Sequence, residues 1–176
     1  LADFAGKNLV VYFYPRDDTY GCTKEAVGFT ERLADFEGLN TVILGVSKDS
    51  VGKHDKFVAK HDLKIALLSD EEGDVCERYG VWKEKSMYGK TYMGIERATY
   101  LIGADGKIAQ LWRKVRVPGH VEAVLDIPHA QTVRTGPHQR QRVGAVGVLR
   151  IHVAEHVEGR AADPMLAHHH RRRGLP

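Results

Sequence analysis

A threonine, a glycine and a cysteine stand close together where a predicted buried strand passes into a predicted helix. Cys22 falls in the first turn of that helix, where the helix dipole and the free backbone N–H groups stabilise a thiolate. The thiolate is the nucleophilic form of cysteine. Thr19 can donate a hydrogen bond to the sulfur or to an oxygen substrate beside it, and Gly21 permits a close approach of backbone to substrate. The segment therefore predicts nucleophilic chemistry at Cys22.

The number and spacing of the cysteines limit the redox chemistry. Two cysteines are too few for a disulfide framework or a four-cysteine zinc site. They do not form Cys-x-x-Cys, which argues against an ordinary dithiol–disulfide exchanger. The second cysteine, Cys76, lies 54 residues after Cys22 in a predicted short helix. It is interpreted as a small buried hydrophobe that needs no function, with a resolving thiol as the alternative.

Strands and helices alternate in the sequence around Cys22. Apolar, β-branched and aromatic runs typical of strands buried on both faces of a sheet occupy 8–14, 41–46 and 65–68. Helices are predicted at 22–38, from 47 or 50 to 61, at 71–79 and at 118–125. Two further strands, 98–102 and 107–112, pair as a hairpin across a turn at 104–106. This order predicts an α/β fold with a mixed sheet covered by helices on both faces, a plan similar to that of thioredoxin.

The composition of the chain changes near residue 125. Residues 1–125 carry 18 basic and 19 acidic side chains, whereas residues 126–176 carry 8 and 4, so the basic balance belongs to the end of the chain. All 14 aromatic residues precede residue 113, and a segment without aromatics builds little core. We therefore predict one domain at 1–125 and a largely irregular, basic Arg- and His-rich tail at 126–176. Its composition is typical of a shifted reading frame in a GC-rich gene.

Two patterns in the tail resemble binding motifs. His-x-x-Glu-His at 152–156 fits a zinc-hydrolase pattern, but no third ligand is placed and we expect no metal site. The histidines and arginines at 168–173 could contact nucleic acid through their charge, yet without interleaved aromatics we expect no specific nucleic-acid binding. No apolar run approaches the roughly 20 residues needed to span a bilayer, which excludes an integral membrane protein. No secretory signal is visible, and we expect a cytoplasmic location.

The pattern Pro-x-x-x-Thr-x-x-Cys, formed by Pro15, Thr19 and Cys22, resembles the active-site signature of the peroxiredoxins. The surrounding Tyr-Phe-Tyr-Pro-Arg-Asp-Asp-Thr and Gly-Cys-Thr-Lys-Glu are similar to the peroxiredoxin Q branch, also called bacterioferritin comigratory protein. Further stretches that agree with this branch are found at 45–50, 79–82 and 94–102. The resemblance covers about residues 1–125 and implies a thioredoxin-like fold and a thiol-dependent peroxidase that serves antioxidant defence.

The resemblance also implies a role for each residue of the site. Cys22 would be the peroxidatic cysteine, whose thiolate attacks the peroxide and becomes a sulfenic acid. Thr19 would hydrogen-bond the attacked peroxide, and Pro15 would shield the sulfenate from solvent. Arg97 would hold the thiolate and polarise the peroxide, because negative charge builds on the leaving oxygen. Glu25 would orient Arg97, and no metal, haem or flavin is needed.

Three features depart from the pattern of that branch. Tyr20 stands where a proline or small residue is usual, and we expect it to narrow the pocket. Many members have a resolving cysteine five residues after the peroxidatic one, where this chain has Val27. Family members also have a hairpin and a strand before Leu1, so we expect this chain to begin late. If Cys76 is inert, an external thiol such as thioredoxin, glutaredoxin or glutathione must reduce the sulfenate.

Alternative interpretations remain for single residues and for the whole chain. Arg97 could be an ordinary surface ion-pair partner. Asp17 and Asp18 could be acid–base groups, but they are more typical of turn residues in a solvated loop. The alternative for the whole chain is a non-catalytic thioredoxin-like binding module. The resemblance favours a monomer that acts on hydroperoxides.

Overall fold

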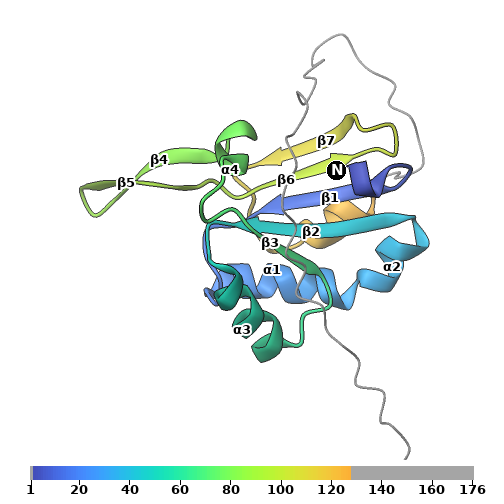
Figure 1. Cartoon of the computed structure of the whole chain (residues 1–176), viewed down its shortest axis with the longest axis horizontal. Coiled ribbons are helices and arrows are strands. Elements are labelled where there is room, and N and C mark those ends of the chain that lie inside the picture. Colours follow the sequence, from blue (N-terminus) through green and yellow to red (C-terminus); the bar gives the residue numbers. More distant parts are fainter. Residues whose placement is uncertain (1, 128–176) are drawn as a thin grey trace, which may run out of the picture.

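A five-stranded mixed sheet forms the centre of the molecule in the computed structural model, which describes residues 2–127 (Figure 1). The strands are β1 (Asn8–Phe13), β2 (Thr41–Ser47), β3 (Ala66–Ser69), β6 (Ala98–Ile102) and β7 (Ile108–Arg113). Their order is β3-β2-β1-β6-β7, with β1 to β3 parallel and β6 and β7 antiparallel to their neighbours. The predicted mixed sheet is confirmed. The predicted tail, its two binding patterns and its origin lie outside the described residues.

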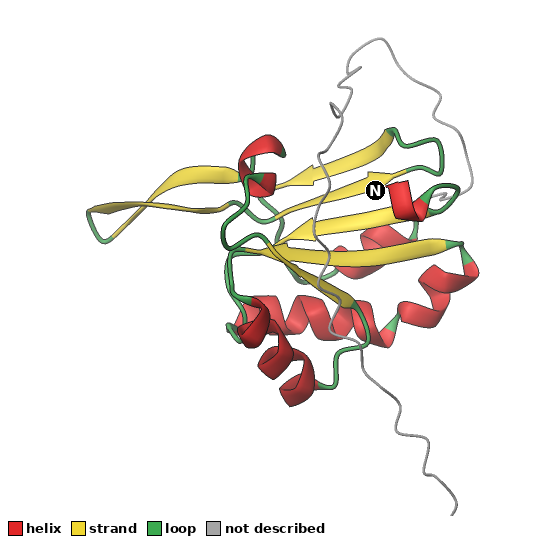
Figure 2. Ribbon diagram, in the orientation of Figure 1, coloured by secondary structure: helices red, strands yellow, loops and turns green. Residues whose placement is uncertain are grey.

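The helices lie along both sides of this sheet, though unequally (Figure 2). They are η1 (Ala2–Phe4), α1 (Tyr20–Glu31), α2 (Leu33–Gly38), α3 (Val51–His61), α4 (Val75–Arg78) and α5 (His120–Leu125). Apolar side chains of α1, α2, α3 and α5 share one core cluster, whereas α4 packs on the opposite face. The single helix predicted over 22–38 is wrong in one respect: Arg32, at φ −100° and ψ 8°, separates α1 from α2.

The two core clusters follow from the alternation of side chains along β1. Val10, Tyr12 and Tyr14 face the cluster beneath α1, while Leu9 and Phe13 face the other cluster. Successive side chains of a strand point to opposite faces, so an unbroken apolar run fits a strand covered on both sides. The sheet is therefore a barrier between two separate sets of buried side chains.

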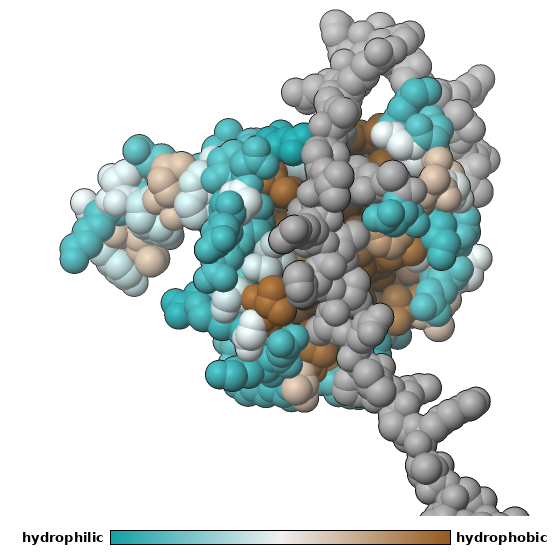
Figure 3. Space-filling model, in the orientation of Figure 1, coloured by the Kyte–Doolittle hydropathy of each residue, from teal (hydrophilic) through white to brown (hydrophobic). Residues whose placement is uncertain are grey.

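A second, two-stranded sheet was missed by the sequence interpretation. β4 (Trp82–Met87) and β5 (Lys90–Ile95) form an antiparallel hairpin that projects from the body of the molecule (Figure 1). Tyr88 and Gly89 connect the strands with φ of 52° and 74°, as in a two-residue hairpin turn. The side chains of β4 and β5 mix charged and apolar types on both faces, so no alternation of polar and apolar residues marks these strands. Figure 3 shows this mixture on the projecting part of the molecule. Tyr88 is 97% exposed.

Two kinds of feature are absent from residues 2–127. In that part of the chain, no helix has the length and apolar character that a bilayer crossing requires. The same residues contain no group of three or more His, Cys, Asp or Glu side chains placed to hold a metal ion.

Candidate active site

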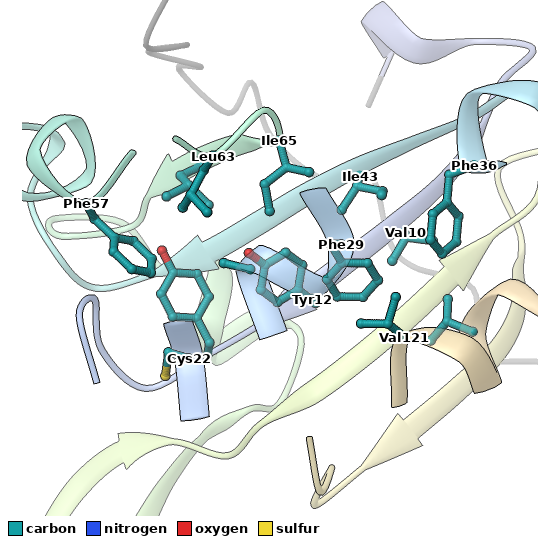
Figure 4. Close-up of a cluster of buried hydrophobic side chains, with 14 of the residues drawn as sticks. Val10, Tyr12, Cys22, Phe29, Phe36, Ile43, Phe57, Leu63, Ile65 and Val121 are labelled. Atoms are coloured by element: carbon teal, nitrogen blue, oxygen red, sulfur yellow. The ribbon is translucent and has the colours of Figure 1, made fainter. Parts of the chain in front are cut away.

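Cys22 is the third residue of α1 and lies at one edge of the buried cluster that also contains Tyr12, Phe29 and Phe57 (Figure 4). The helix begins immediately after the loop that leaves β1. Thr19 is its N-cap residue, and the Thr19 carbonyl accepts a hydrogen bond of 2.8 Å from the Thr23 N–H. Cys22 is therefore held in the first turn of a 12-residue helix, as the sequence predicts, where backbone N–H groups favour an anion.

A guanidinium group lies directly against the sulfur of this cysteine. Arg97 Nη2 donates a hydrogen bond of 3.1 Å to Cys22 Sγ, and Arg97 Nη1 donates to Glu25 Oε2. Gly21 lies beside the guanidinium, where a Cβ would be in ordinary van der Waals contact with Arg97 Nη2 at 3.4 Å. Arg97 immediately precedes β6, and Glu25 lies three residues after Cys22 in α1. Residues 75 positions apart are thus joined in one Glu–Arg–Cys chain.

Burial sets the charges in this chain of contacts. Glu25 is fully buried, and burial raises its pKa to about 7, although Arg97 opposes this shift. Burial also disfavours the charge on Arg97, but Glu25 and Cys22 outweigh it and raise the pKa of the guanidinium. Arginine therefore stays a cation beside the sulfur at every ordinary pH. Glu25 Oε1 has no hydrogen-bond partner among the described residues.

The structure places the other predicted site residues in the exposed loop before α1. Pro15 and Thr19 are exposed, and Thr19 Oγ1 donates to the Arg16 carbonyl at 3.1 Å rather than to Cys22. Tyr20 does not narrow the site: its side chain is 77% exposed, and Lys24 Nζ lies 4.4 Å from the centre of its ring. The two residues of the loop signature are therefore near the cysteine in sequence, while the direct contacts to the sulfur come from Arg97.

Cys76 lies in α4 on the opposite side of the sheet. It is fully buried in the second core cluster, and its N–H donates to Asp70 Oδ2 at 2.9 Å. Burial, and after it the Asp70 carboxylate, raises the pKa of the Cys76 thiol beyond its usual range. The side chain belongs to the core, and it shares no cluster with Cys22.

Sequence reasoning missed three polar residues beside the arginine. Thr99 Oγ1 and His120 Nε2, both buried, share a hydrogen bond of 2.8 Å, and burial followed by Arg97 lowers the pKa of His120 to about 4. The third is Lys85 of β4, whose Nζ donates to the Ile95 carbonyl and whose pKa is lowered by burial and then by Arg97. These residues come from three distant segments, so no local pattern marks them.

The interpretation of Asp17 as a solvated turn residue is wrong. Its carboxylate is buried, with Oδ1 2.7 Å from the Tyr14 hydroxyl and Oδ2 2.7 Å from His54 Nδ1. Asp18 does lie at the surface, in the left-handed region with φ of 58°. It binds Lys60 and His61 of α3 at 2.6 and 2.8 Å. Both aspartates connect the loop to α3.

Known proteins share this arrangement of sequence and fold. The family profile described as the AhpC/TSA family matches residues 1–111. Peroxiredoxin Bcp of Bacillus subtilis is 50% identical over 125 residues, which cover 71% of this chain and 80% of the relative. Peroxiredoxin Bcp of Escherichia coli K12 is 43% identical over 126 residues, with 72% and 81% covered. A solved structure on the alkyl peroxide reduction activity of the Xanthomonas campestris bacterioferritin comigratory protein has a TM-score of 0.68 at 48% identity and covers 71% and 80%.

The fold and the arginine-bound cysteine define a thioredoxin-fold thiol enzyme. The chain belongs to the AhpC/TSA family, and among its members it is similar to the peroxiredoxins of the Q or Bcp branch. The resemblance of the sequence to this branch is thereby confirmed.

Proposed function

We propose that this chain is a thiol-dependent peroxidase in which Cys22 reduces hydrogen peroxide and organic hydroperoxides. The observation that carries the proposal is the contact of 3.1 Å between Arg97 Nη2 and Cys22 Sγ, with Arg97 anchored on a buried carboxylate. The alkyl peroxide reduction activity of the Xanthomonas relative supports organic hydroperoxides as substrates.

The reaction is a two-electron oxidation of the sulfur. The Cys22 thiolate forms a bond to one peroxide oxygen, the O–O bond breaks, and the departing oxygen takes a proton. The products are a cysteine sulfenic acid and either water or an alcohol. A thiol reductant then supplies two electrons and two protons, which releases water and restores the thiol.

Each neighbouring residue has a separate part in this step. Arg97 donates a hydrogen bond to the sulfur and stabilises the negative charge that develops on the departing oxygen. Glu25 fixes one arm of the guanidinium, so that the other arm reaches the sulfur. The Thr19 hydroxyl donates a hydrogen bond to the Arg16 carbonyl and keeps lone pairs with which it accepts a hydrogen bond from a peroxide O–H. Pro15 shields the sulfenate on the solvent side of the loop.

We infer that the chain works with one cysteine and an external reductant. Val27 occupies the position of the resolving cysteine found in many members of the branch, and Cys76 is buried in the cluster on the far face of the sheet. A disulfide requires Cα atoms about 4.4–6.8 Å apart, which two residues on opposite faces of an intact sheet do not provide. Thioredoxin, glutaredoxin or a small thiol would therefore reduce the Cys22 sulfenate directly.

The assembly and location follow from the same chemistry. Cys22, Glu25 and Arg97 all come from one chain, so the site is complete in a monomer. A reducing compartment is needed to regenerate the thiol after each turnover, and we place the protein in the cytoplasm, where thiols are kept reduced.

Peroxide consumption by three proteins tests this function. The wild type, Cys22→Ser and Cys76→Ser are compared with dithiothreitol and with a thioredoxin system, and intact mass is measured after one peroxide pulse. We expect only Cys22→Ser to be inactive, and the wild type to gain one oxygen or one reductant adduct.

Two outcomes would contradict this assignment. A mass loss of two hydrogens that requires both cysteines would make Cys76 the resolving thiol. A wild type without turnover or mass change would favour the alternative, a thioredoxin-like binding module without catalysis.

A further inference from the structure

The loop between β1 and α1, residues 14–19, contains one buried acidic side chain. Pro15, Arg16, Asp18 and Thr19 are exposed, whereas Asp17 is only 9% exposed. A buried carboxylate is costly unless hydrogen bonds replace the water that it loses. The partners of Asp17 therefore show what holds the loop in place.

Three hydrogen bonds reach Asp17, and two of them go to its carboxylate. The Tyr14 hydroxyl donates to Oδ1 at 2.7 Å, and the Asp17 N–H donates to Asp49 Oδ2 at 2.8 Å. The third contact joins Oδ2 to His54 Nδ1 at 2.7 Å. A carboxylate has no proton to give, so Nδ1 of His54 is the donor. The histidine thus binds the loop through one defined proton.

The opposite nitrogen of this histidine has no partner among the described residues. His54 is 2% exposed, and its Nε2 is buried without a hydrogen bond. Leaving a buried polar atom unpaired costs about 1–3 kcal/mol. An apolar side chain at this position of α3 would avoid that cost but would leave Asp17 Oδ2 without the donor from His54, with only the Tyr14 hydroxyl donating to Oδ1. The hydrogen bond from His54 Nδ1 to Asp17 is therefore the interaction that an apolar side chain at this position could not make.

The loop transmits this anchoring to the residues beside the cysteine. Thr19 Oγ1 donates to the carbonyl of Arg16, the residue that precedes Asp17, and the Thr19 carbonyl caps the first turn of α1. Figure 1 shows α3 beside the start of α1. A shift of Asp17 therefore displaces the neighbouring Arg16 carbonyl and, with it, the Thr19 hydroxyl that donates to that carbonyl.

We propose that His54 is a positioning residue for peroxide reduction, which acts by donating its Nδ1 proton to Asp17 and so fixing the loop that places Thr19 beside Cys22. The inference rests on the proposed function, because it concerns how that site receives its substrate. It assigns α3, which holds no residue of the family signature, a part in aligning the peroxide. A misplacement of about 1 Å costs on the order of 100-fold in rate.

Three substitutions of His54 separate this role from simple packing. His54→Asn keeps an N–H near the place of Nδ1, His54→Gln moves the amide toward the place of Nε2, and His54→Leu removes the donor while keeping apolar volume. For each variant, two rates are measured at Cys22: oxidation by hydrogen peroxide and alkylation by iodoacetamide. Alkylation reports the reactivity and exposure of the sulfur and does not need Thr19 to hold a peroxide.

We expect the peroxide rate to fall about 10- to 100-fold in His54→Leu and His54→Gln, with alkylation changed less than about threefold. His54→Asn should recover most of the peroxide rate. Phe57→Leu in the same helix is the control, because it loosens the packing of α3 against the core and leaves the donor from His54 to Asp17 in place. It should leave the ratio of the two rates unchanged.

Two results would overturn the role of His54. One is a wild-type peroxide rate in His54→Leu, and the other is a parallel loss of both rates in all three variants. Both results require that the wild type consumes peroxide. They therefore differ from failure of the proposed function, in which the wild type itself does not consume peroxide.

Discussion

Removing the cation beside the sulfur should slow peroxide reduction and also lower the stability of the fold. In Arg97→Gln, Cys22 loses a charge-assisted hydrogen bond of 3.1 Å, a contact worth about 1.5–3 kcal/mol. Each 1.36 kcal/mol in a barrier is about tenfold in rate, so this contact alone accounts for roughly 10- to 100-fold. The departing oxygen also loses its charged donor, and removal of such a donor costs about 10²–10³ in rate. Because the same guanidinium makes both interactions, the two losses overlap, and we expect the second-order rate constant with hydrogen peroxide to fall by about 10²–10³.

The effect of replacing Glu25 should depend on whether Arg97 is present. Glu25 acts only through Arg97, so Glu25→Gln should lower the rate constant roughly tenfold in the wild type and hardly at all in Arg97→Gln. The two substitutions should also be coupled in their effect on stability, where the second change partly reverses the first. Arg97→Gln leaves a buried carboxylate unpaired and should lower the free energy of unfolding by about 1–3 kcal/mol, and Glu25→Gln in that variant should restore part of it.

The assay is single-turnover oxidation of the reduced protein, followed by mass, with unfolding in urea as the stability measurement. Arg113→Gln is a matched control, since Arg113 pairs with Glu96 at 2.6 Å and makes no contact with Cys22. The reasoning is refuted if Glu25→Gln lowers the peroxide rate equally in the wild type and in Arg97→Gln, because the two residues would then act independently.

Three further predictions concern stability. Burial holds the pKa of Glu25 near 7, above its ordinary value of 4.5. The folded chain therefore binds the extra proton between these values, and the stability of the wild type relative to Glu25→Gln should fall by about 3 kcal/mol as the pH rises through that window. Urea titrations from pH 4 to 8 check this. A rise with pH in the stability of the wild type relative to Glu25→Gln would contradict it. Gly45→Ala should destabilise by about 1–3 kcal/mol, since its Cβ would lie 2.6 Å from the Tyr12 hydroxyl; Gly52→Ala, which meets nothing within 4 Å, is the control in thermal unfolding. Phe29→Ala should cost about 3–5 kcal/mol, because the ring is fully buried between Tyr12 and Phe36; a loss under 1 kcal/mol would count against close packing there.

The sequence predicted best those features that are encoded locally. The strand predicted at 8–14, observed at Asn8–Phe13, and the helix turn at Cys22 follow from a continuous apolar run and from the signature beside it, and both are confirmed. The hairpin of β4 and β5 could not be predicted in the same way. Its strands project from the body of the molecule, so one-sided burial does not impose an alternating pattern on them.

The contacts of the site depend on distant segments. Nothing local to Asp17 shows that His54, 37 residues away, removes it from solvent, and turn propensity alone gave the wrong interpretation. Arg97 was assigned through resemblance, because a lone arginine before a strand has no spacing that points to a cysteine 75 residues earlier. A family signature supplies such pairings only for residues that lie within its motif.

The position of the two cysteines on opposite faces of the sheet also sets how long an oxidised molecule persists. In the proposed one-cysteine scheme, no second thiol lies on the face of Cys22, so the sulfenate is reduced by collision with a thiol of another molecule. Its lifetime then varies inversely with the concentration of reductant. A second peroxide competes in the same interval, and that reaction leads to an irreversible sulfinic acid. The fraction of molecules lost in a peroxide burst therefore records the ratio of peroxide to available thiol during that burst.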